Sequence, residues 1–137
     1  MHAGHDGRED PVSAGLYERI YAAAALVPAG MVATYGDIAH IVGAGVDGRM
    51  VGEALAVLPK QRAAVVPWQR ILSRDGTIST RGLQQQALLE AEGVAFDHTG
   101  RVILARHRWA GPSAADAARL GLRCLPPRDD AEQLSLL

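Results

Sequence analysis

The feature that most restricts the possible folds of this sequence is a pair of short predicted helices. Each helix has its own start signal, and a glycine-rich turn joins the two. The first begins at Thr34, whose hydroxyl suits the cap position, and Asp37 three residues later completes an approximate capping box. Residues 43–48 form the turn, and Asp47 can cap the second helix, predicted from Arg49 to Val57. This is the outline of a helix-turn-helix, although similar helix pairs also occur in domains that bind no nucleic acid.

The other periodic segments add helices and short hairpins around this pair. Apolar residues at helical spacing predict a helix from Ser13 to about Val27, and a second is predicted from Leu83 to Glu92, closed by Gly93. Turn signals at Asp75–Gly76 and at residues 97–100 each lie between short segments that favour strands, and they predict two β-hairpins. The predicted fold class is therefore mainly α with small β-hairpins, and 137 residues suit one domain.

Composition excludes several classes of protein. No apolar run reaches the roughly 18 residues of a membrane span, and residues 1–10 lack the apolar segment of a signal peptide. A single cysteine, Cys124, excludes an internal disulfide, and the isolated histidines predict no metal site. The net charge is −1, but residues 49–108 carry nine Lys and Arg against five acids, so only this part could supply a basic surface that faces DNA.

A tryptophan follows a proline at the end of a short apolar run. The pair Val65–Val66 is β-branched and precedes Pro67, and both features favour an extended backbone. Trp68 is therefore predicted where a strand ends and the chain turns. A lone tryptophan in such a place can be a plain core aromatic. The polar pair that follows, Gln69–Arg70, points instead to a function, because it completes one of a set of motifs.

Five motifs, in the same order and with similar spacing, resemble the O6-alkylguanine-DNA alkyltransferases over about residues 15–110. They are Val27–Gly30, Thr34–Ala39, Arg49–Leu55, Pro67–Arg70 and Leu88–Val94. The resemblance implies a winged helix-turn-helix-like DNA-binding domain whose second helix enters the minor groove. Where those enzymes have Pro-Cys-His-Arg, this chain has Pro-Trp-Gln-Arg. That replacement is similar to the alkyltransferase-like proteins, which bind alkylated DNA and do not repair it themselves.

The resemblance also implies roles for single residues. Arg49 matches the arginine that fills the gap left by a flipped nucleotide, and Tyr35 matches the tyrosine that helps to rotate the 3′ phosphate. Small side chains at Gly52 and Ala54 would let the helix approach the groove floor. The pocket for the flipped base is expected to include Pro67, Trp68, Gln69, Arg70 and Arg81. For each of these residues a plain structural role is the alternative: a solvated arginine, a core aromatic or ordinary helix packing.

The expected chemistry follows from what the Trp68 segment lacks. Alkyl transfer needs a thiolate activated by a neighbouring base, and neither Trp68 nor Gln69 can supply these groups. Glu92, at the family's third active-site position, is expected to serve packing or helix capping. The resemblance therefore implies a non-enzymatic sensor, with no catalytic residue and no cofactor, that flips O6-alkylguanine in duplex DNA and directs it to nucleotide excision repair. The alternatives are a winged-helix transcription regulator that binds undamaged DNA, and an enzyme such as a glycosylase that acts on the flipped base.

The two ends of the chain are expected to lie outside the DNA-binding domain. Residues 1–11 are predicted to be disordered, residues 12–110 to form the domain, and residues 111–137 to be a tail with a possible short helix. The last five residues resemble the bacterial sliding-clamp-binding pentapeptide, so Gln133, Leu134, Leu136 and Leu137 would bind a clamp unless the leucines pack on their own domain. A monomer in the cytoplasm, associated with the nucleoid and not with a membrane, is expected.

Overall fold

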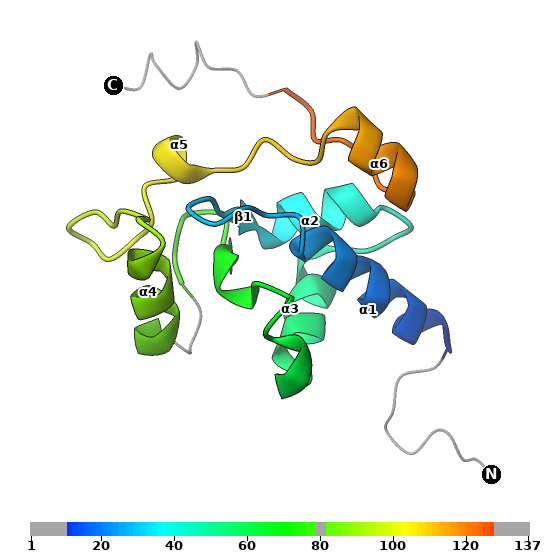
Figure 1. The fold of residues 1–137 in the computed structure, drawn as a ribbon, viewed down its shortest axis with the longest axis horizontal. Helices are drawn as coiled ribbons and strands as arrows, with labels where there is room; N and C mark the ends of the chain where they lie inside the picture. Colours follow the sequence, from blue (N-terminus) through cyan, green and yellow to red (C-terminus); the bar gives the residue numbers. More distant parts are fainter. Residues whose placement is uncertain (1–10, 79–81, 128–137) are drawn as a thin grey trace.

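The computed structural model describes residues 11–78 and 82–127, and most of its regular structure is helical (Figure 1). The elements are α1 (Pro11–Ala24), β1 (Ala33–Thr34), α2 (Tyr35–Val42), α3 (Gly48–Ala56), the 3₁₀ helices η2 (Lys60–Arg62) and η3 (Trp68–Arg70), β2 (Ile71–Leu72), α4 (Gly82–Ala91), α5 (Leu104–His107) and α6 (Ala114–Leu120). Helices α1, α2 and α3 pack on one another, and α4 packs against η3. The predicted fold class is confirmed.

The helix pair forms as predicted, because each of its helices carries its own cap. The Thr34 hydroxyl accepts a hydrogen bond from the Asp37 N–H at 3.0 Å, and the Asp37 carboxylate accepts one from the Thr34 N–H at 3.1 Å. Asp47 accepts a bond from the Met50 N–H at 2.9 Å and caps α3. These bonds use backbone N–H groups that a helix start would otherwise leave unpaired, so they fix where α2 and α3 begin.

Two hydrophobic clusters lie on opposite faces of the small sheet. The larger one joins α1, α2 and α3, and its fully buried aliphatic members include Ile20, Ile38, Ile41 and Val51. The smaller one consists of Val32, Leu72, Leu89, Val94 and Val102. Successive side chains of a strand point to opposite faces. Ala33 and Ile71 accordingly belong to the first cluster, whereas Val32 and Leu72 belong to the second.

The sheet differs from the predicted hairpin in its pairing. The turn at Asp75–Gly76 is present, with the Gly76 N–H donating to the Ser73 carbonyl at 2.9 Å. The strand before it, β2, nevertheless pairs in parallel with β1, so that Ala33 faces Ile71 and Thr34 faces Leu72. The Ser73 N–H also donates to the Thr77 carbonyl at 3.1 Å, so the turn closes locally while the strand before it pairs with a segment far away in the chain. The second predicted hairpin is confirmed by an antiparallel bridge between Phe96 and Val102.

The strand predicted at Val65–Val66 was wrong. The N–H groups of both residues donate to the Arg62 carbonyl, at 3.0 and 2.9 Å, and the chain turns there. Trp68 therefore opens the 3₁₀ helix η3 and precedes a strand instead of ending one. Tertiary packing outweighed the extended preference of β-branched residues, which is weak compared with burial. The Val66 side chain is buried and that of Val65 is 70% exposed.

The segment after residue 104 returns over β1, α2 and α1. Val32 forms a parallel bridge with Arg108, and Trp109 and Leu122 are buried in the larger cluster. The predicted short helix in this segment corresponds to α6, capped by Ser113. The domain boundary at residue 110 stays a prediction. The segment expected to be disordered lies outside the described residues except for Pro11, where α1 begins, and the pentapeptide 133–137 also lies outside them. Within the described ranges, no helix is both long enough and apolar enough to span a membrane.

Candidate nucleic-acid interface

The outer face of α3 is the part of the helix pair that a DNA groove could receive. Arg49, Gly52, Glu53 and Ala56 follow one another at helical spacing and face away from the core, whereas Val51, Ala54 and Leu55 are buried. The Arg49 side chain is 87% exposed, and within the described residues it forms a long ion pair of 3.5 Å with Glu53. Arg49 is therefore available to leave Glu53 for a ligand, since an exposed pair of this kind contributes less than about 1 kcal/mol.

The two small residues predicted on α3 lie on different faces. A Cβ built on Gly52 would meet no atom within 4 Å, so this position is open toward the outside. Ala54 is fully buried, and its carbonyl accepts a hydrogen bond from the Tyr21 hydroxyl at 2.6 Å. The methyl group of Ala54 thus packs in the core. It is not on the face of α3 that was expected to approach the floor of a DNA groove. The exposed Ala56, one turn after Gly52, takes that place on the outer face.

Tyr35 and Arg49 come from neighbouring helix starts. Tyr35 is the first residue of α2 and Arg49 the second residue of α3. At Gly48, a Cβ would lie 3.5 Å from the Tyr35 Cβ and 3.6 Å from the Gly36 nitrogen, which shows how closely the two starts approach. The Tyr35 ring is half-buried against the larger cluster. The fold therefore brings together the two residues expected to act on the DNA backbone and on the gap left by a flipped base.

Helix α4 packs against the Trp68 segment and bonds to its backbone. Trp68 is half-buried and packs on the larger cluster. The Gln85 side chain of α4, itself 1% exposed, donates from its amide nitrogen to the carbonyls of Gln69 at 3.0 Å and Ile71 at 3.3 Å. These bonds fix the backbone on both sides of Arg70. Of the other residues predicted for the pocket, Pro67 is half-buried and Arg81 lies outside the described residues.

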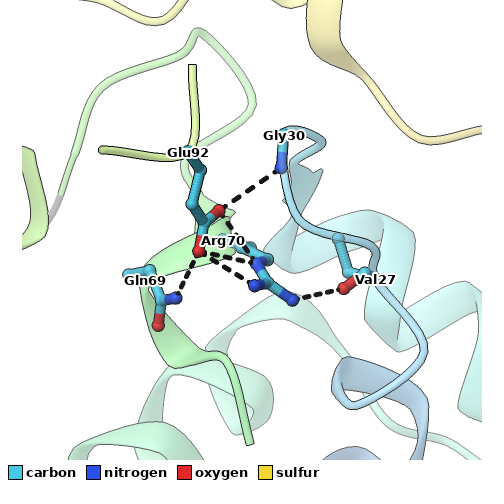
Figure 2. A network of polar contacts seen from close by, with 5 residues as sticks. All are labelled: Val27, Gly30, Gln69, Arg70 and Glu92. Carbon is cyan, nitrogen blue, oxygen red and sulfur yellow. Dashed lines mark hydrogen bonds and ion pairs between the residues drawn. The ribbon is translucent and has the colours of Figure 1, made fainter. Parts of the chain in front are cut away.

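A carboxylate network anchors the same segment (Figure 2). Arg70 donates to Glu92 from its Nε at 3.0 Å and from its Nη2 at 2.9 Å, and its Nη1 donates to the Val27 carbonyl at 2.8 Å. The Gln69 amide donates to Glu92 at 3.0 Å, and the Gly30 N–H does so at 3.4 Å. The Arg70 guanidinium therefore points toward Glu92 and Val27, and it holds η3 in place. That role differs from the predicted lining of a pocket.

Glu92 does more than the packing or capping expected of it, because it accepts bonds from two residues of η3. Partial burial alone raises the pKa of the Glu92 carboxyl. Hydrogen bonds from Arg70 and Gln69, together with the charge of Arg70, outweigh this effect, so the pKa lies below its ordinary value. Glu92 is thus a carboxylate at neutral pH. The Gln69 amide, which donates a hydrogen bond to Glu92, cannot take up a proton. The residue next to Trp68 is therefore not a general base.

The described residues contain no group of three His, Cys, Asp or Glu side chains that could hold a metal ion. The single cysteine of the chain, Cys124, is exposed in the segment after α6 and not in the Trp68 segment. At the site itself the side chains offer an aromatic wall, an amide and an arginine–carboxylate pair. Such groups bind and position a ligand, but they provide no nucleophile for alkyl transfer.

Comparison with known proteins agrees with this geometry. Residues 15–94 match the family model for the DNA-binding domain of 6-O-methylguanine DNA methyltransferase. The DNA base-flipping protein of Escherichia coli (strain K12) is 42% identical over 96 residues, which cover 67% of this chain and 72% of that protein. Alkyltransferase-like protein 1 of Schizosaccharomyces pombe is 39% identical over 88 residues, covering 61% of this chain and 80% of that protein.

A solved structure gives the same result in three dimensions. The S. pombe alkyltransferase-like protein, in a crystal with damaged DNA containing O6-carboxymethylguanine, matches with a TM-score of 0.60 at 34% identity. The match covers 70% of this chain and 95% of that chain. The fold and the helix pair are thus those of the methyltransferase DNA-binding domain. This chain belongs to that family, and it is one of its non-enzymatic, alkyltransferase-like members.

Proposed function

We propose that this protein binds duplex DNA that carries O6-alkylguanine, turns the modified nucleotide out of the helix and leaves it chemically unchanged. The observation that most directly supports this proposal is the Trp68–Gln69 pair, which occupies the positions where an alkyltransferase has its cysteine and histidine. An intact helix pair accompanies it, in which the helix start that carries Arg49 lies close to the helix start at Tyr35. Alkylation removes the N1 proton of guanine and weakens its pairing, so this base is less costly to extrude than a normal one.

Each part of the site has a place in this mechanism. The small outer residues of α3, Gly52 and Ala56, let the helix approach the groove, and Arg49 occupies the space that the nucleotide leaves. Tyr35 acts on the phosphate at the start of α2. Trp68 receives the flipped base on an apolar wall. The Arg70–Glu92 pair keeps that wall in position, because it ties η3 to the end of α4 and to Val27.

A titration tests this function directly. Two duplexes of the same sequence are compared, one with a single O6-methylguanine and one with guanine at that position. We expect at least tenfold tighter binding to the modified duplex, a difference of about 1.4 kcal/mol. Mass spectrometry after incubation should find the masses of protein and DNA unchanged. Equal binding to the two duplexes would point to a regulator of undamaged DNA, and loss of the base would point to a glycosylase.

The bound lesion would then be passed to nucleotide excision repair proteins in the cytoplasm, at the nucleoid. A second partner is the sliding clamp, engaged by Gln133, Leu134, Leu136 and Leu137, because a short apolar peptide of this kind fits a preformed pocket. We expect immobilised full-length protein to retain purified clamp, and a chain that ends at Ala131 to lose it while binding modified DNA normally. Equal retention by the two chains would assign the leucines to packing on their own domain.

A further inference from the structure

We propose that Arg108 is a positioning residue for DNA binding, which neutralises the carboxylate of Asp37 at the start of α2 and so allows a phosphate to approach Tyr35. The proposal rests on the function proposed above, in which α2 begins at the DNA backbone. Arg108 lies beyond the family match at residues 15–94. It is also outside the set of residues that the sequence motifs single out.

The contact between the two residues is short and made at two points. The Arg108 Nε donates to Asp37 Oδ2 at 3.0 Å, and its Nη2 donates to Asp37 Oδ1 at 2.8 Å. The Asp37 side chain is 9% exposed and that of Arg108 is 29% exposed. The same Asp37 carboxylate also accepts the Thr34 N–H in the capping box. Two-point pairs between arginine and a carboxylate are among the stronger polar contacts in proteins, and this one fixes the carboxylate that caps α2.

Backbone hydrogen bonds position Arg108 beside the start of α2. The Val32 N–H donates to the His107 carbonyl at 3.0 Å, and the Trp109 N–H donates to the Val32 carbonyl at 2.8 Å. Residues 107–109 thus run beside the chain just before β1, and Arg108 reaches the first turn of α2. At the other end of α2, the Arg123 N–H donates to the Ile41 carbonyl at 2.8 Å and Arg19 donates to that of Val42 at 3.2 Å. Arg108 and Arg123, which both follow the family match, therefore contact α2 at its two ends.

The charge of Asp37 explains why DNA binding would need this arginine. A helix start attracts a phosphate through its N–H groups and its partial positive charge. Asp37 places a full negative charge two residues after Tyr35, and such a charge would repel the phosphate through a poorly solvated environment. The guanidinium of Arg108 cancels it while leaving the capping bonds in place.

The test compares three variants on the modified duplex and on the matched guanine duplex. Arg108→Met keeps the aliphatic part of the side chain and removes its charge, and we expect about tenfold weaker binding to both duplexes. Adding Asp37→Asn removes the uncancelled charge as well, and the double variant should bind within threefold of wild type. Arg108→Lys, which keeps a charge but not the two-point contact, should lie between wild type and Arg108→Met.

Salt dependence separates charge neutralisation from a merely structural role. Repulsion is screened by salt, so the ratio of the Kd of Arg108→Met to that of wild type should fall as salt rises. A loss caused by misfolding would not fall in this way, and circular dichroism establishes that each variant is folded at the assay temperature. Should Arg108→Met unfold, the double variant carries the test.

Two results would overturn the proposal: an Arg108→Met protein that binds within twofold of wild type, or a folded double variant that still binds ten times more weakly than wild type. The second result would mean that Arg108 contacts DNA directly. Failure of the proposed function is recognised separately, because it would appear as a wild-type protein with no preference for the modified duplex.

Discussion

Replacing Arg49 by Ala should abolish most of the binding to the modified duplex. Without a side chain to fill the gap, the unstacking of the flipped nucleotide, a few kcal/mol, is no longer offset. Since each 1.4 kcal/mol is a factor of ten, the Kd should rise on the order of 100-fold. Folding should be almost unaffected, because Arg49 is 87% exposed and its pair with Glu53 is an ordinary surface contact between residues four apart. Fluorescence anisotropy with labelled duplexes measures the change.

Arg119→Ala is the matched control. Arg119 is also an exposed helix arginine with an ion pair on its own helix, to Asp116 at 2.9 Å. It lies on α6, however, across the molecule from α3 (Figure 1). Arg119→Ala should bind the modified duplex like wild type. If Arg49→Ala binds as tightly as Arg119→Ala, the gap is filled by another residue and the flipping mechanism proposed for Arg49 is wrong.

Replacing Arg70 by Met should lower the free energy of unfolding by about 3 kcal/mol. The change leaves the Glu92 carboxylate partly buried with only weaker partners, and breaking a buried pair costs about 3–5 kcal/mol. The lower end of that range applies, because the two side chains remain 18% and 15% exposed. For a chain of this size the melting temperature should fall by about 10 °C, which thermal unfolding followed by circular dichroism measures.

A double variant and a pH series show whether the charge of Glu92 is the cause. Adding Glu92→Gln to Arg70→Met should recover most of the loss, since no buried charge then remains. The pKa of Glu92 in the folded protein is lowered from about 4.5, so the stabilisation is present above that value and is lost as the pH falls through the folded pKa. The difference between wild type and Arg70→Met should therefore shrink in acid. A difference in melting temperature that does not change with pH would exclude the charge as its cause.

The parts of this fold that could be predicted from the sequence are those fixed by local bonds. The capping box of Thr34 with Asp37 and the cap at Asp47 lie within three residues of their partners, so residue types alone predicted α2 and α3. Helical spacing also contained the information that Ala54 is buried, because it shares a face with Val51 and Leu55. The resemblance to the alkyltransferases placed Ala54 on the face that meets DNA. The helical period alone places Ala54 on the buried face.

What could not be predicted depends on contacts between distant segments. The pairing of β1 with β2 joins Ala33 to Ile71, and no local signal marks a parallel partner. Arg70 meets Glu92 and Val27, which are 22 and 43 residues away. Arg108 and Asp37 are separated by 71 residues. In the last two cases the sequence shows a charged residue but not its partner. Arg70, which was expected in a pocket, therefore anchors η3 instead.

The return of the chain over α1 and α2 leaves α3 uncovered. Helix α6 and the segment that ends at Pro127 lie on one side of α1 and α2, and α3 projects from the opposite side (Figure 1). The described part of the chain therefore ends on the side of the domain opposite the surface proposed to meet DNA. A protein that bound α6 or the described segment after it would not cover α3, and a duplex under α3 would leave that segment accessible. The geometry accommodates a ternary assembly, in which a second protein joins at the lesion while the first still holds the damaged base.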